Sequence, residues 1–318
     1  MRLVPDQRGL AEAGARLKKG ELVAFPTETV YGLGADATNP QAISALYAAK
    51  GRPQFNPLIA HVASVEQALQ EGQFNTQARL LADLFWPGPL TLVVPRHAQG
   101  TVCDLACAGL ASVGLRYPSH PIAQRIIEEA GRPIAAPSAN RSGHISPTEA
   151  AHVLSDLDGR IEAVVEGFAS PVGVESTIIA CLDDRPLLLR HGGITVEAIA
   201  EKTGLHLRTQ EQGHIIAPGM LESHYAPQAR VRLNATEIKA GEAVLLFGDI
   251  LPAGSDQARA RLNLSPRGDL TEAAGHLYDY LRRLDRPDIS GIAIAPIPES
   301  GLGAAINDRL RRAAAPRP

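Results

Sequence analysis

Residues 9–26, GLAEAGARLKKGELVAFP, decide the fold class of this chain of 318 residues. Gly9 to Lys19 has the spacing of a helix that ends at Gly20, and Glu21 to Phe25 is the apolar run of a short buried strand that Pro26 closes. A helix followed directly by a buried strand is the unit from which sheets covered by helices are built. The stretch therefore predicts alternating helices and strands.

The same alternation continues as far as residue 190. Further helices are expected over Gln41–Lys50, Val65–Leu69, Thr76–Phe85, Pro121–Ala130 and Pro147–Leu154. Further strands are expected over Leu58–Val62, Leu90–Pro95, Ser112–Arg116, Ile134–Ala136, Ala163–Val165, Val174–Ala180 and Leu187–Arg190. This order indicates an α/β or α+β domain with a large sheet.

A second, smaller domain is expected near the C-terminus. From Leu205 to Arg230 the periodicity fades into a polar stretch with several glycines and prolines, a composition typical of an interdomain linker. Beyond it, strands are expected at Ala243–Phe247 and Ile292–Ala295, and helices at Leu270–Leu284 and Ala304–Ala313. We therefore predict domains at 1–204 and 231–318, joined by a linker at 205–230, with the second domain Rossmann-like or flavodoxin-like.

Composition narrows the class of protein. With 45% hydrophobic and 20% charged residues and a formal net charge of -3, the chain has no global basic field to hold a nucleic acid, although a local basic groove is compatible with these values. Three cysteines cannot complete a disulfide framework, which favours a reducing compartment. No apolar run has the length of a signal peptide or a membrane span, so we expect a cytoplasmic protein without a membrane partner.

The usual nucleotide-binding motifs are absent, since there is no Walker-type loop and the glycines at 32 and 34 lack the third glycine of a dinucleotide loop. Four other segments place hydroxyls or cations at the expected ends of strands and helices. They are Pro26-Thr-Glu-Thr-Val-Tyr-Gly-Leu, Lys50-Gly-Arg-Pro-Gln-Phe-Asn-Pro-Leu, Ala136-Pro-Ser-Ala-Asn-Arg-Ser-Gly-His-Ile-Ser-Pro-Thr and Val174-Glu-Ser-Thr-Ile.

Each segment also has an ordinary structural interpretation. Lys50 and Arg52 end a helix, where cations interact with its negative C-terminal pole. Ser146, Pro147 and Glu149 have the pattern of a helix start, with Ser146 as N-cap and Glu149 completing a capping box. Arg116 ends a strand, where it is either a solvated surface residue or a guanidinium that binds a carboxylate through two parallel hydrogen bonds.

At these four segments the chain resembles the threonylcarbamoyl-AMP synthase family. The resemblance runs from about the first helix through Thr195, and Asn263-Leu-Ser-Pro and Gly301-Leu-Gly-Ala-Ala-Ile-Asn-Asp-Arg-Leu resemble the C-terminal domain of the longer members. It implies a YrdC-like catalytic domain, with a twisted mixed sheet around a basic concavity, and a small Rossmann-like domain. It also implies that the linker folds back over the active site.

The resemblance further implies an enzyme that uses L-threonine, bicarbonate or CO2, and ATP. The threonine amine would form a carbamate, whose oxygen attacks the α-phosphorus of ATP and expels pyrophosphate. Mg²⁺ is expected to be bound through the ATP phosphates. The product, threonylcarbamoyl-AMP, would pass to a downstream tRNA threonylcarbamoyl transferase machinery that modifies adenosine next to the anticodon. Stable direct binding of tRNA is not expected.

Roles for single residues follow from the same resemblance. Lys50 and Arg52 are the expected catalytic cations at the triphosphate. The expected ATP-binding residues are Arg52, Asn56, Ser112, Ser138, Asn140, Ser146, Arg190 and Tyr225, and the expected threonine-binding residues are Thr29, His61, Arg116 and Ser176. The chain departs from the family pattern at His191, where many relatives have proline, and at residues 221–223, where relatives often have basic residues.

Several alternatives stay open at this point. Glu28 and Glu175 are candidates for general bases or for magnesium ligands. An RNA-binding module of the same fold would show salt-sensitive RNA affinity without threonine-dependent turnover. Carbamoyl transfer in hydrogenase maturation also uses YrdC-like domains, but those proteins carry zinc-finger modules, and this chain has no Cys-x-x-Cys pair.

Overall fold

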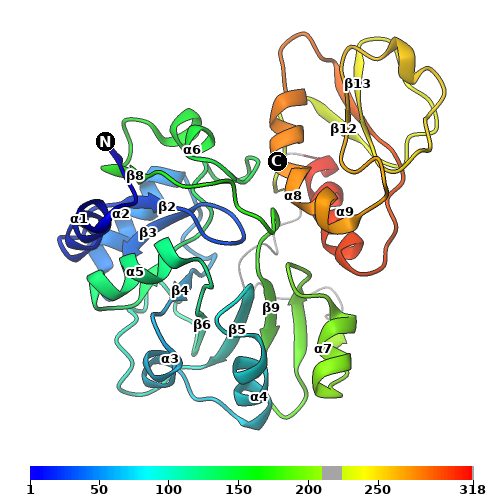
Figure 1. Cartoon of the computed structure of the whole chain (residues 1–318). Helices are drawn as coiled ribbons and strands as arrows, with labels where there is room; N and C mark the ends of the chain where they lie inside the picture. The colour runs from blue at the N-terminus through cyan, green and yellow to red at the C-terminus, as the bar shows by residue number, and fades with distance from the viewer. Residues whose placement is uncertain (210–223, 317–318) are drawn as a thin grey trace. The chain divides into compact units, whose positions relative to one another are not determined.

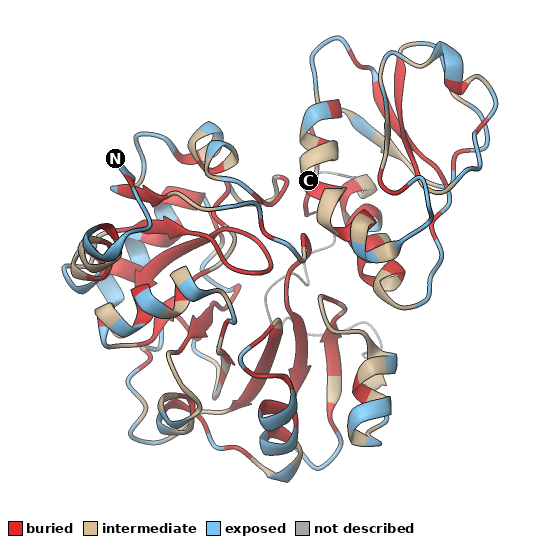
Figure 2. Ribbon diagram, viewed as in Figure 1, coloured by how far each residue is buried: buried red, intermediate tan, exposed pale blue. Residues whose placement is uncertain are grey.

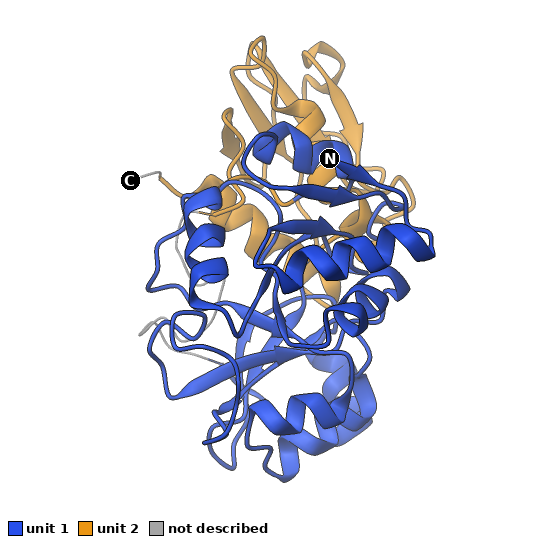
Figure 3. Cartoon of the chain, turned by 90° about the vertical axis from the view of Figure 1, so that its left-hand side faces the viewer, with its two compact units in different colours: residues 1–142, 147–171, 175–220 blue, residues 143–146, 172–174, 221–318 orange. Residues whose placement is uncertain are grey.

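A computed structural model of the chain describes residues 1–209 and 224–316, and it divides them into two compact units (Figure 3). Of the described residues, the first unit comprises 1–142, 147–171 and 175–209, and the second comprises 143–146, 172–174 and 224–316. Both units combine sheets with helices, so the predicted mixed α/β fold class is confirmed.

The first unit is built on a mixed sheet of eleven strands, counted over the described residues, in the order β1-β8-β2-β3-β7-β4-β6-β5-β9-β10-β11. Its strands are β1 (Arg2–Leu3), β2 (Val23–Phe25), β3 (Gly32–Asp36), β4 (Ile59–His61), β5 (Leu90–Pro95), β6 (Ser112–Arg116), β7 (Ile134–Ala135), β8 (Ala163–Val165), β9 (Thr177–Ala180), β10 (Leu187–Arg190) and β11 (Arg208–Thr209). Most of these strands are buried, as their red arrows in Figure 2 show.

Helices flank this sheet (Figure 1). They are α1 (Gln7–Lys18), α2 (Pro40–Lys50), α3 (Val65–Glu71), α4 (Thr76–Phe85), α5 (Pro121–Ala130), α6 (Ala150–Leu157) and α7 (Val196–Thr203). The two ends of α2 show how the sequence determines where a helix begins and ends. The Asn39 side chain accepts from the first amides, Pro40 occupies the first turn, and Gly51 ends the helix with a φ of 60°. No helix within the described ranges is long and apolar enough to cross a bilayer.

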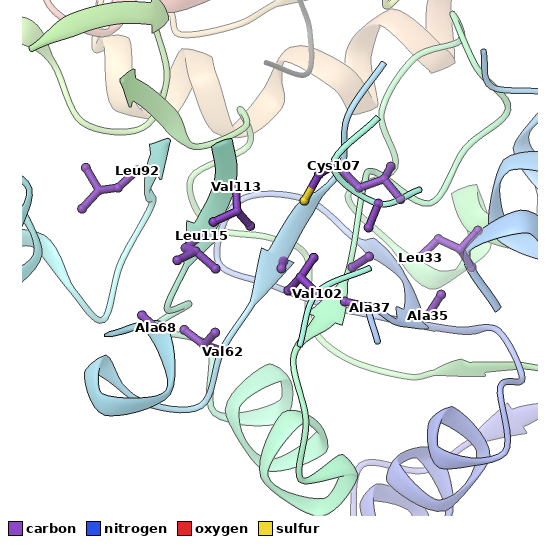
Figure 4. Close-up of a cluster of buried hydrophobic side chains, with 14 of the residues drawn as sticks. Leu33, Ala35, Ala37, Val62, Ala68, Leu92, Val102, Cys107, Val113 and Leu115 are labelled. Carbon is purple, nitrogen blue, oxygen red and sulfur yellow. The ribbon is translucent and has the colours of Figure 1, made fainter. Parts of the chain in front are cut away.

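The largest apolar core lies against one face of the sheet. Figure 4 shows part of it, with Leu33 from β3, Leu92 from β5 and Val113 and Leu115 from β6 gathered in one cluster. These side chains come from strands that are far apart in the sequence, and they are buried almost completely. The core therefore ties together the strands that carry the motifs.

The second unit holds a four-stranded sheet, again counted over the described residues, in the order β12-β15-β13-β14, and all its registered pairs are parallel. Its elements are β12 (Arg230–Arg232), β13 (Glu242–Leu246), the short 3-10 helix η1 (Ser255–Gln257), β14 (Arg261–Asn263), α8 (Leu270–Leu284), β15 (Gly291–Ile294) and α9 (Leu302–Ala314). A parallel sheet in which α8 connects β14 to β15 agrees with the Rossmann-like expectation.

The predicted helix start at Ser146 is wrong. α6 begins at Ala150, its N-cap is Glu149, and the Glu149 side chain makes no capping hydrogen bond. The preceding residues are bound elsewhere in the unit, because the Pro147 carbonyl accepts from the Tyr31 amide at 2.8 Å and the Thr148 carbonyl accepts from the Ser170 amide at 3.1 Å. Long-range backbone pairing has overridden a local capping pattern.

Strand β3 was not expected, because Gly32 to Asp36 lacks the branched and aromatic residues that mark a strand. A Cβ at Gly34 would lie 2.7 Å from the Phe25 ring and 3.0 Å from the Val23 carbonyl oxygen, so close approach to β2 requires glycine there.

Both ends of the predicted linker form strands in the structure. Arg208 and Thr209 form β11, which pairs in parallel with β10, and Arg230 begins β12. The glycines and prolines at 213, 218 and 219, and the departures at 221–223, lie outside the described residues.

We expect Leu92→Ala to lower the free energy of unfolding by about 2–5 kcal/mol, because it removes a fully buried side chain from the core of Figure 4. Leu84→Ala is the matched control, since Leu84 on α4 is 42% exposed and should change stability by less than about 1 kcal/mol. Urea unfolding followed by circular dichroism measures both. Equal losses would contradict the assigned core.

Candidate active site

The candidate site lies on the sheet face opposite to the core of Figure 4. Successive side chains of a strand point to opposite faces. Because Leu92 and Leu115 point into that core, Thr91 and Arg116 point away from it. His61 is the register partner of Arg116 in the parallel pair of β4 and β6, and it shares that face.

Five polar residues meet at one edge of the sheet, namely the three named above together with Ser176 and Arg190. β4 and β6 run parallel and end at His61 and Arg116. β5 is antiparallel to β6, so Thr91, near its start, lies at the same edge. Ser176 precedes β9, which is parallel to β5, and Arg190 ends β10, which is antiparallel to β9. Strand direction thus brings together residues from five neighbouring strands.

A buried ion pair joins this edge to the loop after β2. The Arg116 guanidinium donates to Glu28 Oε1 at 2.7 Å, and the two side chains are only 5% and 8% exposed. Burial raises the pKa of Glu28, but Arg116 and nearby backbone amides lower it by more, so the pKa lies below its usual value. Glu28 is therefore a carboxylate at neutral pH.

His61 lies beside this pair as a neutral imidazole. Burial, and then the positive charge of Arg116, lower its pKa from 6.5 to about 3. Its Nδ1 is 3.3 Å from the Ile59 carbonyl oxygen. A neutral imidazole next to a guanidinium can serve as a hydrogen-bonding group without adding a second positive charge.

Hydroxyl groups line the remainder of this edge. Ser176 Oγ is 2.7 Å from Thr91 Oγ1, and Arg190 donates to the Ser176 carbonyl oxygen at 2.9 Å and to Ser176 Oγ at 3.2 Å. In the loop with Glu28, Thr29 Oγ1 is 2.8 Å from Thr27 Oγ1. The four predicted threonine-binding residues, Thr29, His61, Arg116 and Ser176, are all buried in the first unit.

The predicted catalytic lysine is buried under the loop that follows β7. Lys50 Nζ donates to the carbonyl oxygens of Ser138 and Asn140 at 2.5 Å each, while the Lys50 carbonyl accepts from the Ser142 amide at 2.8 Å. Burial, and then Arg52, lower its pKa well below the usual value. Lys50 thus fixes the loop that carries two of the predicted ATP-binding residues.

Arg52 and Asn56 form a second buried group after α2. Arg52 donates to the carbonyl oxygens of Asn56 at 3.3 Å and Pro57 at 3.0 Å. Asn56 is fully buried, and neither of its side-chain polar atoms has a hydrogen-bond partner among the described residues. An unpaired buried amide is rare and costly, and it points to a bound group that completes its hydrogen bonds.

The other predicted ATP-binding residues are Ser112, Ser146 and Tyr225. Ser112 begins β6, on the same face as Arg116 but about 13 Å from it at the usual rise per residue. Ser146 and Tyr225 belong to the second unit. There Tyr225 is buried with a φ of 61°, and its ring is stacked on Tyr278 with centroids 5.7 Å apart. Their roles toward ATP stay predictions.

Comparison with known proteins assigns the family. A family model described as "Telomere recombination" matches residues 15–192, and one described as "Threonylcarbamoyl-AMP synthase, C-terminal domain" matches residues 194–315. The chain is 42% identical to the threonylcarbamoyl-AMP synthase of Bacillus subtilis, over 97% of this chain and 93% of that protein. This chain belongs to the threonylcarbamoyl-AMP synthase family. The resemblance seen in the motifs is thereby confirmed.

Other members of the threonylcarbamoyl-AMP synthase family match over nearly the full length. The synthase of Pyrococcus abyssi is 41% identical, over 95% of this chain and 92% of that protein. A crystal structure of P. abyssi Sua5 complexed with L-threonine superposes with a TM-score of 0.89, at 36% identity, over 99% of this chain and 97% of that chain. The mixed sheet and the parallel C-terminal sheet described above are thus the architecture of this family.

Two residues of the edge were not among the predicted site residues. Thr91 gave no signal, because a threonine inside an apolar strand is ordinary. The sequence makes Glu28 a candidate general base or metal ligand, but its pairing with Arg116, 88 positions away in the sequence, requires the fold. In the sequence, the feature that indicates a role for Glu28 is its position between two threonines, Thr27 and Thr29.

We expect His61→Gln to change the pH dependence of stability. A pKa lowered from 6.5 to about 3 means that the unfolded chain binds the proton first, so this contribution is complete above pH 6.5 and is lost as the pH falls toward 3. Between pH 7 and pH 5 the unaltered chain should lose about 2 kcal/mol more than the variant. Urea unfolding at both pH values measures the difference, and equal losses would show that His61 titrates normally.

Proposed function

We propose that this chain is a nucleotidyltransferase that joins L-threonine, bicarbonate or CO2, and ATP into threonylcarbamoyl-AMP and pyrophosphate. The observation that carries the proposal is the similarity, over 99% of the chain, to a protein whose structure was solved with L-threonine. The buried cations and hydroxyls at one sheet edge support it, because the substrates bring a carboxylate and a triphosphate to be neutralised.

In this proposal, Arg116 binds the threonine carboxylate, and Thr29, His61 and Ser176 surround the rest of the amino acid. These residues are buried, so a threonine bound among them would be shielded from water, and its hydroxyl and methyl would meet groups of fixed position. The neutral His61 fits this role because a second cation would repel Arg116.

The chemistry then needs no enzyme nucleophile. The threonine nitrogen attacks the carbon of CO2 and loses protons, which gives a carbamate. A carbamate oxygen attacks the α-phosphorus of ATP, the bond from that phosphorus to the bridging oxygen breaks, and pyrophosphate leaves. The chain contributes position and charge, with Arg52 and Arg190 as cations near the phosphates.

Lys50 acts in the proposal through the loop that it holds. Its Nζ donates to the carbonyl oxygens of Ser138 and Asn140, and that loop would bind ATP through the side chains of these two residues. Without Lys50 the loop would lose both bonds. The lysine is thus expected to matter for the use of ATP and little for the recognition of threonine.

The remaining partners are also proposed. Within the described residues no group of three or more histidines, cysteines, aspartates or glutamates could hold a metal ion, and we expect Mg²⁺ to arrive on the ATP phosphates. A downstream transferase would carry the threonylcarbamoyl group to tRNA, because the chain, with its net charge of -3, is not expected to bind tRNA stably. A cytoplasmic location stays a prediction from composition.

We expect pyrophosphate release from ATP to require threonine and bicarbonate together, because the attacking oxygen exists only after the carbamate has formed. Purified protein is incubated with ATP, magnesium and each component in turn, and pyrophosphate is measured together with the adenylated product by mass spectrometry. Serine should react more slowly, since a missing methyl costs about 1–3 kcal/mol of specificity. Equal release with threonine or bicarbonate omitted would rule out the mechanism.

We expect Arg116→Ala and Lys50→Ala to separate the two substrates. Arg116→Ala should weaken threonine binding about 10-fold or more, because it removes a charged hydrogen-bond donor. Lys50→Ala should lower kcat about 100-fold and leave threonine affinity nearly unchanged. Arg125→Ala is the control, since Arg125 lies 49% exposed on α5. Calorimetry with threonine and the pyrophosphate assay distinguish the variants, and normal threonine affinity in Arg116→Ala would remove this arginine from the pocket.

A further inference from the structure

The ion pair between Glu28 and Arg116 leaves one polar atom of each partner unused. Only one carboxylate oxygen, Oε1, accepts from Arg116. Glu28 Oε2 and Arg116 Nε are both buried, and neither has a hydrogen-bond partner among the described residues. Buried polar atoms without partners are few in folded proteins and cost free energy, so each requires an explanation.

The two unused atoms have complementary chemistry. Oε2 is an anionic acceptor, and Nε is a cationic donor. An α-amino acid carries the matching groups, an ammonium donor and a carboxylate acceptor, on the same carbon atom. The ion pair thus offers an acceptor for the ammonium group and a donor for the carboxylate group of an amino acid.

Resting on the proposed function, we infer that Glu28 is a further threonine-binding residue, whose Oε2 accepts a hydrogen bond from the threonine nitrogen while Oε1 holds Arg116 for the threonine carboxylate. The nitrogen keeps at least one N–H as ammonium, as amine and as carbamate. An acceptor at this place therefore serves the substrate at each stage of the reaction.

The charge of Glu28 separates this role from that of a general base. Arg116 and the backbone amides of Glu28 and Ser119 keep the pKa of Glu28 below its usual value, against the effect of burial. A carboxylate with a lowered pKa is a weak base, but it stays ionised and can accept a charge-assisted hydrogen bond. Glu28 thus recognises and orients the nitrogen, and the proton released on carbamate formation leaves by another route.

The loop around Glu28 is built to hold this geometry. Thr27 Oγ1 donates to the Val30 carbonyl oxygen at 2.7 Å and accepts from the Val30 amide at 3.3 Å, which closes the loop on both sides of Glu28. Thr27 and Thr29 are also buried. The backbone that carries Glu28 is therefore held in place by buried hydrogen bonds.

The test compares Glu28→Gln with the unaltered full chain for two ligands, L-threonine and (R)-3-hydroxybutyrate, which is threonine without its amino group. The glutamine amide keeps an oxygen that can accept from Arg116. In place of the anionic Oε2, it presents an uncharged N–H donor to the threonine nitrogen. We expect threonine affinity to fall about 10- to 100-fold, as for the loss of a charged hydrogen bond, with 3-hydroxybutyrate affinity unchanged. Glu128→Gln, 51% exposed on α5, is the matched control.

Each other outcome overturns the inference in a recognisable way. A parallel loss for both ligands would mean that Glu28 only orients Arg116. Unchanged threonine affinity with a lowered kcat would assign it to proton transfer. If Glu28→Gln does not fold, the unaltered chain decides the question, since it should bind threonine at least about 10-fold more tightly than 3-hydroxybutyrate. An unaltered chain without threonine-dependent pyrophosphate release would instead refute the proposed function itself.

Discussion

The buried ion pair between Glu28 and Arg116 is the interaction on which the candidate site depends. It joins a loop after β2 to the end of β6, and those strands are separated by three others in the sheet. Either charge alone at this depth would lower stability by several kcal/mol, because it would be buried without a partner. The pair therefore fixes the position of both segments, and the neutral state of His61 follows partly from the charge of Arg116.

Successive side chains of a strand point to opposite faces of the sheet, so one face can pack against the core while the other carries the site. Leu92 and Leu115 give one face to the apolar core, and the residues next to them, Thr91 and Arg116, give the other face to the site. A shift of register by one residue in β6 would bury Arg116 in the core and move Leu115 into the site. The core thus enforces the register that the site requires.

Much of the fold could be predicted because it depends on local patterns. The helices at 76–85, 121–130 and 270–284 and the strands at 90–95, 112–116 and 187–190 have the limits that periodicity predicts. The start of α6 and strand β3 could not, since long-range backbone pairing at Pro147 and close packing at Gly34 decide them. In the site, residue types and strand ends were visible in the sequence. The pairing of Glu28 with Arg116, and of Lys50 with two carbonyls, depends on segments about 90 positions apart.

Within the described residues, Glu28, Arg116 and Asn56 have buried polar atoms without a hydrogen-bond partner, and these atoms limit how stable the fold can be without its ligands. Each buried atom without a partner lowers stability, and a ligand that completes its hydrogen bonds recovers that free energy on binding. Substrate binding should therefore stabilise the folded chain, in proportion to the logarithm of ligand concentration over its dissociation constant. Replacing these residues by apolar ones of similar volume would remove the penalty, and with it the groups that recognise the substrates. The unpaired atoms of Glu28, Arg116 and Asn56 within the described residues are thus better explained by binding than by folding.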